Sequence, residues 1–346
     1  MAAETAAILN LASAGDHIVT SPRLYGGTET LFQVTLPRLG IDFTFVDNPD
    51  DPESWQSAIQ PNTKALYAET FGNPIADILD IPAVAEVAHA NQVPLIVDNT
   101  MATAALVRPL EHGADVVVVS TTKFYTGNGA AIGGAIIDGG KFDWTVQRDG
   151  EDVFPYFTTP DPAYHGLKYA DLGAPAFALK ARAGLLRDTG AAISPFNAWV
   201  ALQGLDTLQL RVDKHNENAA AVAEFLAGHE KVAKVNYAGL PDSPYKAVKD
   251  KLGLAHTGSV LSFEVAGDPD DRIKAWAFID ALKLHSNLAN IGDVRSLVVH
   301  PASTTHSQSN AEGLKRAGIS QATVRLSVGI EDINDIIDDL KRGFAA

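Results

Sequence analysis

A lysine, an aspartate and two hydroxyl groups stand where apolar segments of the chain end. The run Val116–Val119 is followed at once by Ser120–Lys123, of sequence Ser-Thr-Thr-Lys, and Asp98 closes the apolar run Pro94–Val97. In open α/β sheets, ligands bind at the carboxyl ends of the strands. A lysine amine in that position can form a Schiff base with an aldehyde, so we expect a site for such chemistry around Lys123.

The same residue types meet the requirements of pyridoxal phosphate. The amine of Lys123 would hold the cofactor aldehyde as an imine, and the carboxylate of Asp98 would keep the pyridine nitrogen protonated, so that the ring can accept electrons. The hydroxyls of Ser120 and Thr122 could donate hydrogen bonds to the phosphate oxygens. A lysine that follows an apolar strand is usually a solvated strand end, so the inference depends on the combination of these features.

The segments that must position these side chains alternate between strand-like and helix-like patterns. Apolar, β-branched runs in the first half of the chain predict strands at His17–Thr20, Phe43–Val46, Ala65–Tyr67, Pro94–Val97, Val116–Val119 and Ala135–Ile137. The run Pro82–Ala90 has apolar positions at helical spacing. Strands separated by amphipathic helices predict an α/β fold with a mainly parallel sheet.

The second half of the chain predicts three further regions. Periodicity fades between residues 140 and 192, where several prolines indicate an irregular segment. A long helical region follows at 195–226, with a bend expected near Gly204. A second domain is expected to begin near Lys231, which divides the chain into residues 1–230 and 231–346. Its predicted elements are the strands Ser259–Glu264 and Thr323–Val328 and the helix Asp332–Phe344.

The stretch from Asp98 through Lys123 to Gly134 resembles the fold-type I, pyridoxal-phosphate-dependent enzymes of cysteine and methionine metabolism. Further matching segments are Ser21–Thr28, Glu69–Pro74 and Val324–Asp332, so that the resemblance covers essentially the whole chain. It implies a fold-type I transferase with a mainly parallel, seven-stranded-type sheet domain flanked by helices. A smaller α+β domain is expected at the C-terminus.

The resemblance also assigns roles near the cofactor. It implies that Tyr25 stacks on the pyridine ring and takes part in proton transfer, and that Asn73 lies near the phenolic oxygen of the cofactor. Glu69 is expected to contact the residues around the cofactor and not the cofactor itself. From the local sequence alone, Tyr25 could equally pack against the turn at Gly26, because buried tyrosines often cap apolar packing. Asn73 could be only a turn residue before Pro74.

A substrate carboxylate is expected to bind Arg325. This residue lies inside an apolar run, where a charge is costly unless it is paired, and its planar fork suits a carboxylate. The resemblance implies that role for Arg325 and an assisting role for Ser296. The alternative for Arg325 is a structural ion pair.

Within the family, the segments Ser194–Asn197 and Ser296–Ser307 are most similar to the sulfhydrylase branch. That similarity implies replacement of acetate by sulfide or a thiol at the γ-carbon of O-acetyl-L-homoserine, with sulfide giving L-homocysteine for methionine biosynthesis. Cystathionine γ-synthase and γ-lyase activities are the alternatives inside the family; methionine-cleaving γ-lyases typically have a cysteine where this chain has Gly27. A truncated, non-catalytic binding or scaffold protein is the alternative from another class.

The start of the chain departs from the family pattern. In the family, the run that begins here at Met1 follows a Ser-Gly pair whose helix N-terminus holds the phosphate, and an arm with a tyrosine and an arginine precedes it. Met1 is therefore expected at the phosphate site. Without the arm, which reaches the neighbouring subunit of a homo-oligomer (a dimer of dimers), weak cofactor binding is expected. An internally assigned start and a real truncation both fit the sequence.

Composition excludes several classes of function. The 346 residues carry a net charge of -15 and contain 0 cysteines, which argues against a nucleic-acid binder and excludes disulfides, thiolate metal sites and a cysteine nucleophile. No apolar run approaches the roughly 20 residues that span a membrane, and a cytoplasmic protein is expected. His300 and His306 lack the spacing of a helical metal pair, so no metal is expected. The glycines at 127–129 follow Lys123 and do not open a helix, which argues against a dinucleotide site.

Overall fold

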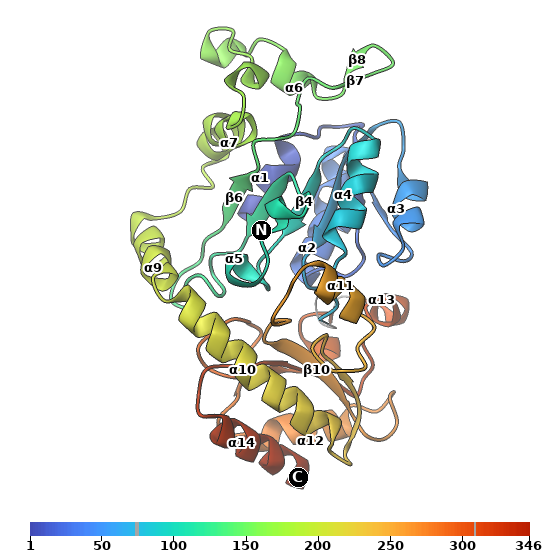
Figure 1. Ribbon diagram of the computed structural model, residues 1–346, viewed down its shortest axis with the longest axis vertical. Helices are drawn as coiled ribbons and strands as arrows, with labels where there is room; N and C mark the ends of the chain where they lie inside the picture. Colours follow the sequence, from blue (N-terminus) through green and yellow to red (C-terminus); the bar gives the residue numbers. More distant parts are fainter. Residues whose placement is uncertain (73–75, 308) are drawn as a thin grey trace.

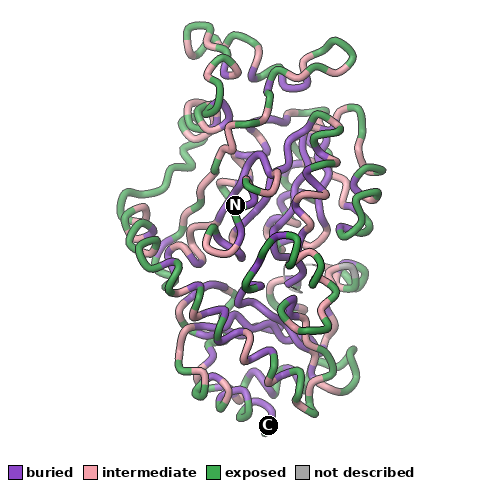
Figure 2. Tube along the Cα trace, in the orientation of Figure 1, coloured by how far each residue is buried: buried purple, intermediate pink, exposed green. Residues whose placement is uncertain are grey.

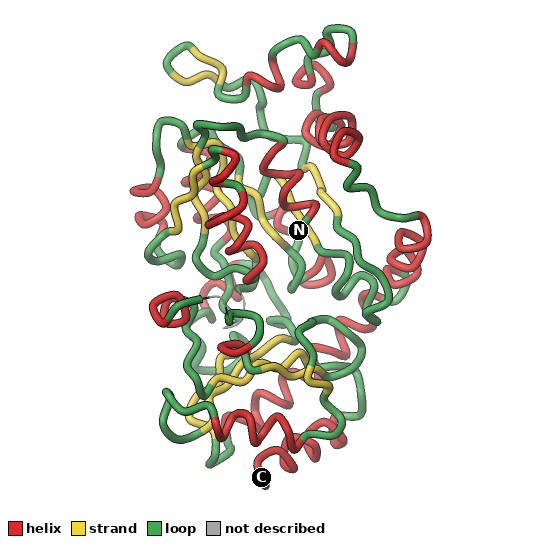
Figure 3. Tube along the Cα trace, turned by 180° about the vertical axis from the view of Figure 1, so that it is seen from behind, coloured by secondary structure: helices red, strands yellow, loops and turns green. Residues whose placement is uncertain are grey.

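The computed structural model describes residues 1–72, 76–307 and 309–346. A large sheet occupies the centre of the molecule, a smaller sheet lies beside it towards the C-terminus, and the segment around α6 projects from the opposite end (Figure 1). Viewed from behind, the strands of the two sheets form separate sets with helices outside them (Figure 3). The predicted α/β architecture with a second, smaller sheet is confirmed.

The large sheet has the strand order β2-β1-β3-β4-β5-β6. All neighbouring pairs are parallel except β5 and β6, which are antiparallel. The strands predicted from the apolar runs are confirmed. Among the described residues this sheet has six strands, whereas a sheet of the seven-stranded type was expected. The bounds are β1 (His17–Thr20), β2 (Asp42–Phe45), β3 (Thr63–Glu69), β4 (Leu95–Asp98), β5 (Val116–Val119) and β6 (Ala135–Asp138).

Both faces of this sheet are covered at its centre, which is why the central strands β4 and β5 are buried and largely apolar. Along β3, Leu66 and Ala68 face one apolar cluster, whereas Ala65 and Tyr67 face the other. The buried central strands stand out from exposed peripheral loops in Figure 2. The helices of this part are α1 (Ala2–Leu9), α2 (Gly26–Thr30), η1 (Leu31–Thr35), η2 (Pro37–Leu39), α3 (Pro52–Ala58), α4 (Ile81–Ala90), α5 (Thr103–Leu106) and η3 (Pro109–Glu111).

The segment predicted to be irregular consists of a hairpin and short helices around an aromatic cluster. Trp144 stacks on Phe157 with ring centroids 4.4 Å apart, and on Phe177 at 5.1 Å. Aromatic packing of this kind orders a segment that has no long periodic pattern. Its elements are β7 (Gln147–Arg148), β8 (Glu151–Asp152), α6 (Pro155–Thr158), η4 (Pro162–Tyr164), η5 (Tyr169–Leu172), α7 (Ala176–Ala181), η6 (Arg182–Leu186) and α8 (Arg187–Thr189).

The long helical region is divided in two. Helix α9 (Pro195–Leu205) begins after Ser194, whose side chain accepts a hydrogen bond from the backbone N–H of Asn197, and α10 (Leu208–Ala227) follows a short break. A side chain at Gly204 would overlap the carbonyl oxygen of Tyr125. A bend was predicted near this glycine, and the structure has a break between the helices at residues 206–207. Close backbone approach explains why a glycine is needed at 204.

The smaller sheet has the order β11-β12-β13-β10-β9. The apolar side of α10 contributes to its core together with α12 and α14, and the strands predicted within 259–264 and 323–328 are confirmed. The expected domain boundary at residues 230 and 231 stays a prediction. The remaining elements are β9 (Val232–Asn236), α11 (Lys246–Lys251), β10 (Val260–Val265), α12 (Ile273–Ala281), β11 (Ser286–Asn287), β12 (Leu297–Val299), η7 (Pro301–Ser303), α13 (Ala311–Arg316), β13 (Thr323–Ser327) and α14 (Ile333–Ala345).

Among the helices that the structure describes, none combines the length and the apolar character that crossing a bilayer requires.

Candidate active site

The ends of β4 and β5 bring Asp98 and the segment before Lys123 together. In the parallel register, Asp98 lies opposite Glu69 on β3 and Val118 on β5. The backbone N–H of Thr100 donates to Oδ1 of Asp98 at 2.7 Å, and the backbone N–H of Ser120 donates to Oγ1 of Thr100 at 2.8 Å. Adjacent parallel strands thus fix the carboxylate and the Ser120–Lys123 turn at one edge of the sheet.

Lys123 points its amine at a residue of the second half of the chain. Its Nζ donates a hydrogen bond to Oδ1 of Asn290. Burial, and then the positive charge of Arg325, lower the pKa of Lys123 below its ordinary value. Because only the neutral amine attacks a carbonyl, a lowered pKa increases the nucleophilic fraction of this lysine.

Arg325 occupies the middle of β13, opposite Ser262 of β10 and Val299 of β12. It is 3% exposed, and its Nη2 donates to the backbone oxygen of Asn290 at 3.3 Å. Burial lowers the pKa of Arg325 to about 10. A buried guanidinium between two sheets is suited to an anionic group of a substrate.

Asn290 is the residue that the sequence analysis missed. Its side chain accepts from Lys123 and its carbonyl accepts from Arg325, so it joins the two predicted functional cations. The local signal was weak, since an asparagine before Ile291 and Gly292 reads as a turn between strands. Proximity to Lys123, which is 167 positions away in the sequence, arises only from the fold.

Ser296 lies at a different point of the small domain. Its hydroxyl donates to Oε2 of Glu331 at 2.9 Å and accepts from the backbone N–H of Gly329 at 2.9 Å. It is fully buried, and these partners hold β12 against the end of β13. The predicted role of Ser296 at a substrate carboxylate stays a prediction.

Tyr25 stands at the start of α2, with 44% of the residue exposed. Its backbone N–H donates to Oε1 of Glu69 at 2.5 Å, so Glu69 holds the backbone that carries the tyrosine. A side chain at Gly27 would collide with the Tyr25 ring, and one at Gly26 would come within 2.6 Å of the backbone oxygen of Thr305. The two glycines therefore permit the ring to lie over its own helix and the 305 loop to approach it.

The residues predicted to bind the cofactor, most of them at its phosphate, differ in their surroundings. The hydroxyl of Ser120 forms no hydrogen bond with the described residues, which leaves it open to an oxyanion. The hydroxyl of Thr122 donates to the backbone oxygen of Gly133 and accepts from its N–H, at 3.2 and 3.0 Å. Met1 caps the start of α1. Asn73 lies outside the described residues.

Three carboxyl groups are buried beside this site. Asp98, Glu69 and Glu4 are 7%, 8% and 5% exposed. None of the ion pairs found among the described residues involves them. Burial raises the pKa of Asp98, and hydrogen bonds from Thr100 oppose that shift. A buried carboxylate at Asp98 suits a cationic ring nitrogen, so this site fits a protonated pyridine.

The two histidines hold loops in place. His300 shares hydrogen bonds with the hydroxyl of Ser303 through Nδ1 and with the backbone oxygen of Gln321 through Nε2, both at 2.8 Å. His306 shares a hydrogen bond with the hydroxyl of Thr305 at 2.9 Å.

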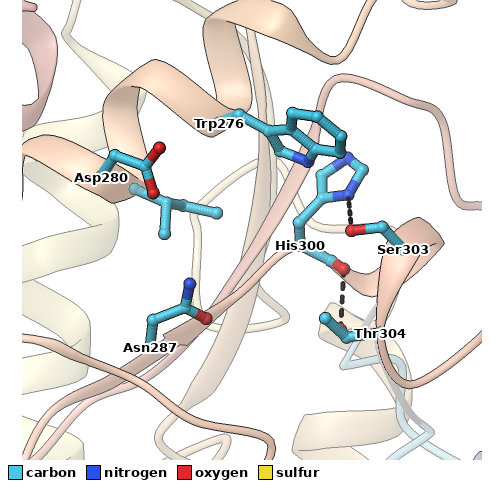
Figure 4. Close-up of a pocket in the computed structure, with 7 residues that line it drawn as sticks. Trp276, Asp280, Asn287, His300, Ser303 and Thr304 are labelled. Carbon is cyan, nitrogen blue, oxygen red and sulfur yellow. Dashed lines mark hydrogen bonds between the residues drawn. The ribbon is translucent and has the colours of Figure 1, made fainter.

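A cavity of about 280 Å³ lies in the small domain, between residues of α12, β11 and the turn at η7 (Figure 4). The rings of Trp276 and His300 meet edge to face there, with centroids 6.1 Å apart. The cavity contains none of the residues predicted to act on a substrate. Its lining residues are Trp276, Ile279, Asp280, Asn287, His300, Ser303 and Thr304.

Comparisons with known proteins identify the family of this chain. The family model for the Cys/Met metabolism PLP-dependent enzymes matches residues 1–345. The O-acetyl-L-homoserine sulfhydrylase of Corynebacterium glutamicum is 76% identical over 345 residues, which cover 100% of this chain and 78% of that protein.

Two solved structures share the fold. A proposed O-acetylhomoserine (thiol)-lyase from Campylobacter jejuni, which carries a pyridoxyl-lysine phosphate, superposes with a TM-score of 0.94 at 40% identity, covering 100% of this chain and 80% of that one. A cystathionine γ-lyase from Lactobacillus plantarum gives a TM-score of 0.81 at 30% identity, covering 99% and 80%.

Proposed function

Because the chain belongs to the family of Cys/Met metabolism PLP-dependent enzymes, we propose that it is an O-acetyl-L-homoserine sulfhydrylase. It uses pyridoxal phosphate to replace the acetate of O-acetyl-L-homoserine by sulfide, which yields L-homocysteine. The observation that carries this conclusion is the 76% identity to a sulfhydrylase along the whole chain. The geometry supports it, since one site combines a nucleophilic lysine, a buried carboxylate and a buried arginine.

The side chains divide the work as follows. When bound, pyridoxal phosphate supplies an electron sink that permits bonds at the substrate carbons to break. Asp98 keeps the ring nitrogen protonated, and Lys123 both holds the cofactor and moves protons at the substrate carbons as a positioned base. Arg325 binds the substrate carboxylate, with Asn290 fixed between it and Lys123. Sulfide forms the new bond to Cγ, and acetate leaves with its electron pair.

A product assay tests the reaction against its rivals. Cofactor-loaded protein with O-acetyl-L-homoserine and sulfide is expected to release homocysteine and acetate in equal amounts. Parallel reactions with cysteine as nucleophile, or with none, detect cystathionine synthesis and elimination. Faster formation of cystathionine or of a keto acid would assign the chain to another activity. The bound cofactor is expected to give a visible absorption band that borohydride reduction removes. If the purified protein shows no such band, the chain would be a scaffold.

Arg325→Ala is expected to weaken the use of O-acetyl-L-homoserine by roughly 1.5–3 kcal/mol, because a charged hydrogen bond to the carboxylate is lost. That energy corresponds to a rise in KM of about 10- to 150-fold. Steady-state kinetics at saturating sulfide measure it, and Arg108→Ala provides a control at an exposed arginine. A KM that stays at the wild-type value would remove Arg325 from the substrate site.

We also propose that a second copy of this chain covers an apolar stripe on α9. Phe196, Trp199, Leu202 and Leu205 recur every third residue and are 66%, 56%, 59% and 41% exposed. Helix α9 lies at the outer edge of the molecule in Figures 1 and 3. Exposed apolar stripes mark interaction sites, and the family resemblance implies that the partner is the same chain.

Charging this stripe is expected to dissociate the oligomer. Trp199→Glu with Leu202→Glu would place two carboxylates in the interface, where unpaired charges are costly. Sedimentation velocity is expected to show a smaller species, while Ile273→Glu, at an exposed residue of α12, keeps the wild-type size. A wild-type protein that sediments as a monomer would refute the proposal. The dimer of dimers stays a prediction, as does the cytoplasmic location, which cell fractionation would test.

A further inference from the structure

Helix α1 delivers a carboxyl group to the buried side of the candidate site. Glu4 is 5% exposed, although acidic side chains are seldom buried without a partner. The hydroxyl of Thr28, itself fully buried, donates to Oε2 of Glu4 at 3.0 Å. The Glu4 side chain also forms a hydrogen bond with the side chain of Asp98. None of the steps assigned above uses Glu4.

A hydrogen bond between two carboxyl groups requires that one of them carries a proton, because two carboxylates only accept. Burial, and then the charge of Asp98, raise the pKa of Glu4 to about 8. For Asp98 the contact with Glu4 acts in the opposite direction and lowers the pKa, against the effect of burial. The backbone N–H of Thr100 already donates to Asp98 at 2.7 Å, which favours the charged form of Asp98. This arrangement favours the proton on Glu4, which makes Glu4 the donor and Asp98 the acceptor.

The groups around Glu4 act on its pKa in both directions. Asp98 on β4 raises its pKa, whereas the amino group of Met1 and the hydroxyl of Thr28 lower it. Tyr67 and Glu69 on β3 also interact electrostatically with Glu4, and the pKa of each is raised in turn, mainly by burial. A second negative charge would therefore be unfavourable in this cluster.

We propose that Glu4 is a positioning residue whose protonated carboxyl, held by Thr28, donates a hydrogen bond to Asp98 and keeps the Asp98 carboxylate directed at the ring nitrogen of the cofactor. Asp98 then accepts hydrogen bonds from Glu4 and from the backbone N–H of Thr100. It can still accept a hydrogen bond from the ring nitrogen. The inference rests on the proposed role of Asp98, but it concerns a proton that the protein holds whether or not it turns over substrate.

The first test measures that proton through stability. Since the pKa of Glu4 in the folded protein is about 8 and its ordinary value is 4.5, its contribution to stability is complete below pH 4.5. That contribution is lost progressively as the pH rises through 8. Glu4→Gln keeps a neutral donor of the same shape, so its Tm is expected to fall less than that of the wild type between pH 5 and pH 8.5.

The comparison is made on the full chain with and without cofactor. Glu86→Gln, at an exposed position of α4, is the control for a lost surface charge, and its Tm is expected to follow the wild type. A Glu4→Gln curve parallel to the wild-type curve over this range would overturn the proposal. Infrared difference spectra give a second readout, because the band of a protonated carboxyl present in the wild type should be absent from Glu4→Gln.

The second test separates positioning from packing. The Gln variant can still donate to Asp98 and accept from Thr28, so its Kd for pyridoxal phosphate is expected to stay within about threefold of the wild type. Glu4→Val fills the space without a donor and is expected to raise Kd about tenfold or more, the size of a lost charged hydrogen bond. Equal affinities of the Val and Gln variants would overturn the positioning role. If Glu4→Val does not fold, the stability and infrared measurements on Glu4→Gln still decide.

These measurements are independent of the reaction. A chain that catalyses elimination or cystathionine synthesis would give the same Tm, infrared and affinity results if Glu4 holds the proton. Conversely, a sulfhydrylase whose Glu4→Gln variant shows no change in pH dependence would retain the proposed function and contradict this inference alone.

Discussion

Lys123→Ala is expected to eliminate covalent attachment of pyridoxal phosphate and to slow homocysteine formation by at least about 10²- to 10⁴-fold. That range is the loss expected from a positioned proton-transfer group alone, and loss of the covalent bond to the cofactor adds to it. The structural reason is that Lys123 lies in the Ser120–Lys123 turn after β5, with its amine next to Asn290 and Arg325, and burial lowers its pKa. Borohydride reduction, digestion and mass spectrometry of both proteins measure the attachment.

A second partly buried lysine provides a matched control. The pKa of Lys180 is also lowered, to about 8, mainly by burial. Its Nζ, however, donates to the backbone oxygen of Asn10 at 2.6 Å and lies over the ring of Phe157. Lys180→Ala is therefore expected to keep the adduct on Lys123. Detection of the pyridoxyl group on Lys180 in the wild type would contradict the assignment.

Asp98→Asn is expected to lower kcat by about 10²- to 10³-fold with little change in KM, because one preorganised electrostatic contact at the reacting group is lost. An amide cannot hold a proton on the ring nitrogen as a carboxylate does, so the electron sink weakens. The substrate carboxylate remains on Arg325, which is why KM should change little. Rapid-mixing measurements of the bound-cofactor absorption, together with steady-state kinetics, distinguish the chemical step from binding.

Asp115→Asn is the matched control for a buried aspartate of the same sheet. Asp115 precedes β5, accepts from the backbone N–H of Leu95 at 2.8 Å, and pairs with His89 at 2.9 Å. It lies at the amino end of β5, whereas Asp98 lies at the carboxyl end of β4. Its substitution should cost stability and leave kcat near the wild-type value. Equal losses of kcat in the two variants would mean that Asp98 acts through the fold and not on the cofactor.

Much of the site could be predicted from short patterns. Four consecutive valines at 116–119 specify a strand buried on both faces, and the polar residues after them mark its carboxyl end. The same reasoning found Asp98 at the end of β4. These features are local, because the period of a strand and the position of its last residue are set by neighbours in the chain. The mainly parallel character of the sheet followed from the alternation with helices, whereas the order of its strands is given only by the structure.

Other parts of the site were beyond such patterns because they depend on contacts between distant segments. Asn290 reaches Lys123 from a loop of the small domain, and nothing in Leu288–Gly292 distinguishes it from an ordinary turn. Ser296 was chosen by family similarity, whereas the structure ties its hydroxyl to Glu331 and Gly329. Hydrogen bonds of side chains to partners far away in sequence leave no periodic signal for local analysis to detect.

The sequence by itself therefore determined most of the elements and the strand ends near Lys123 and Asp98, because residue type and local periodicity act through neighbouring residues. The roles of Lys123, Asp98 and Arg325 stay predictions. Only the tertiary structure decided that the carboxyl groups of Glu4 and Asp98 lie close enough to share a proton. The first turn of α1 could have faced solvent, but packing of Ala7 and Ile8 against the sheet turns Glu4 inward to Asp98 and Thr28. Desolvation is a property of the assembled core, so the pKa of a carboxyl group cannot be read before the segments that bury it are in place.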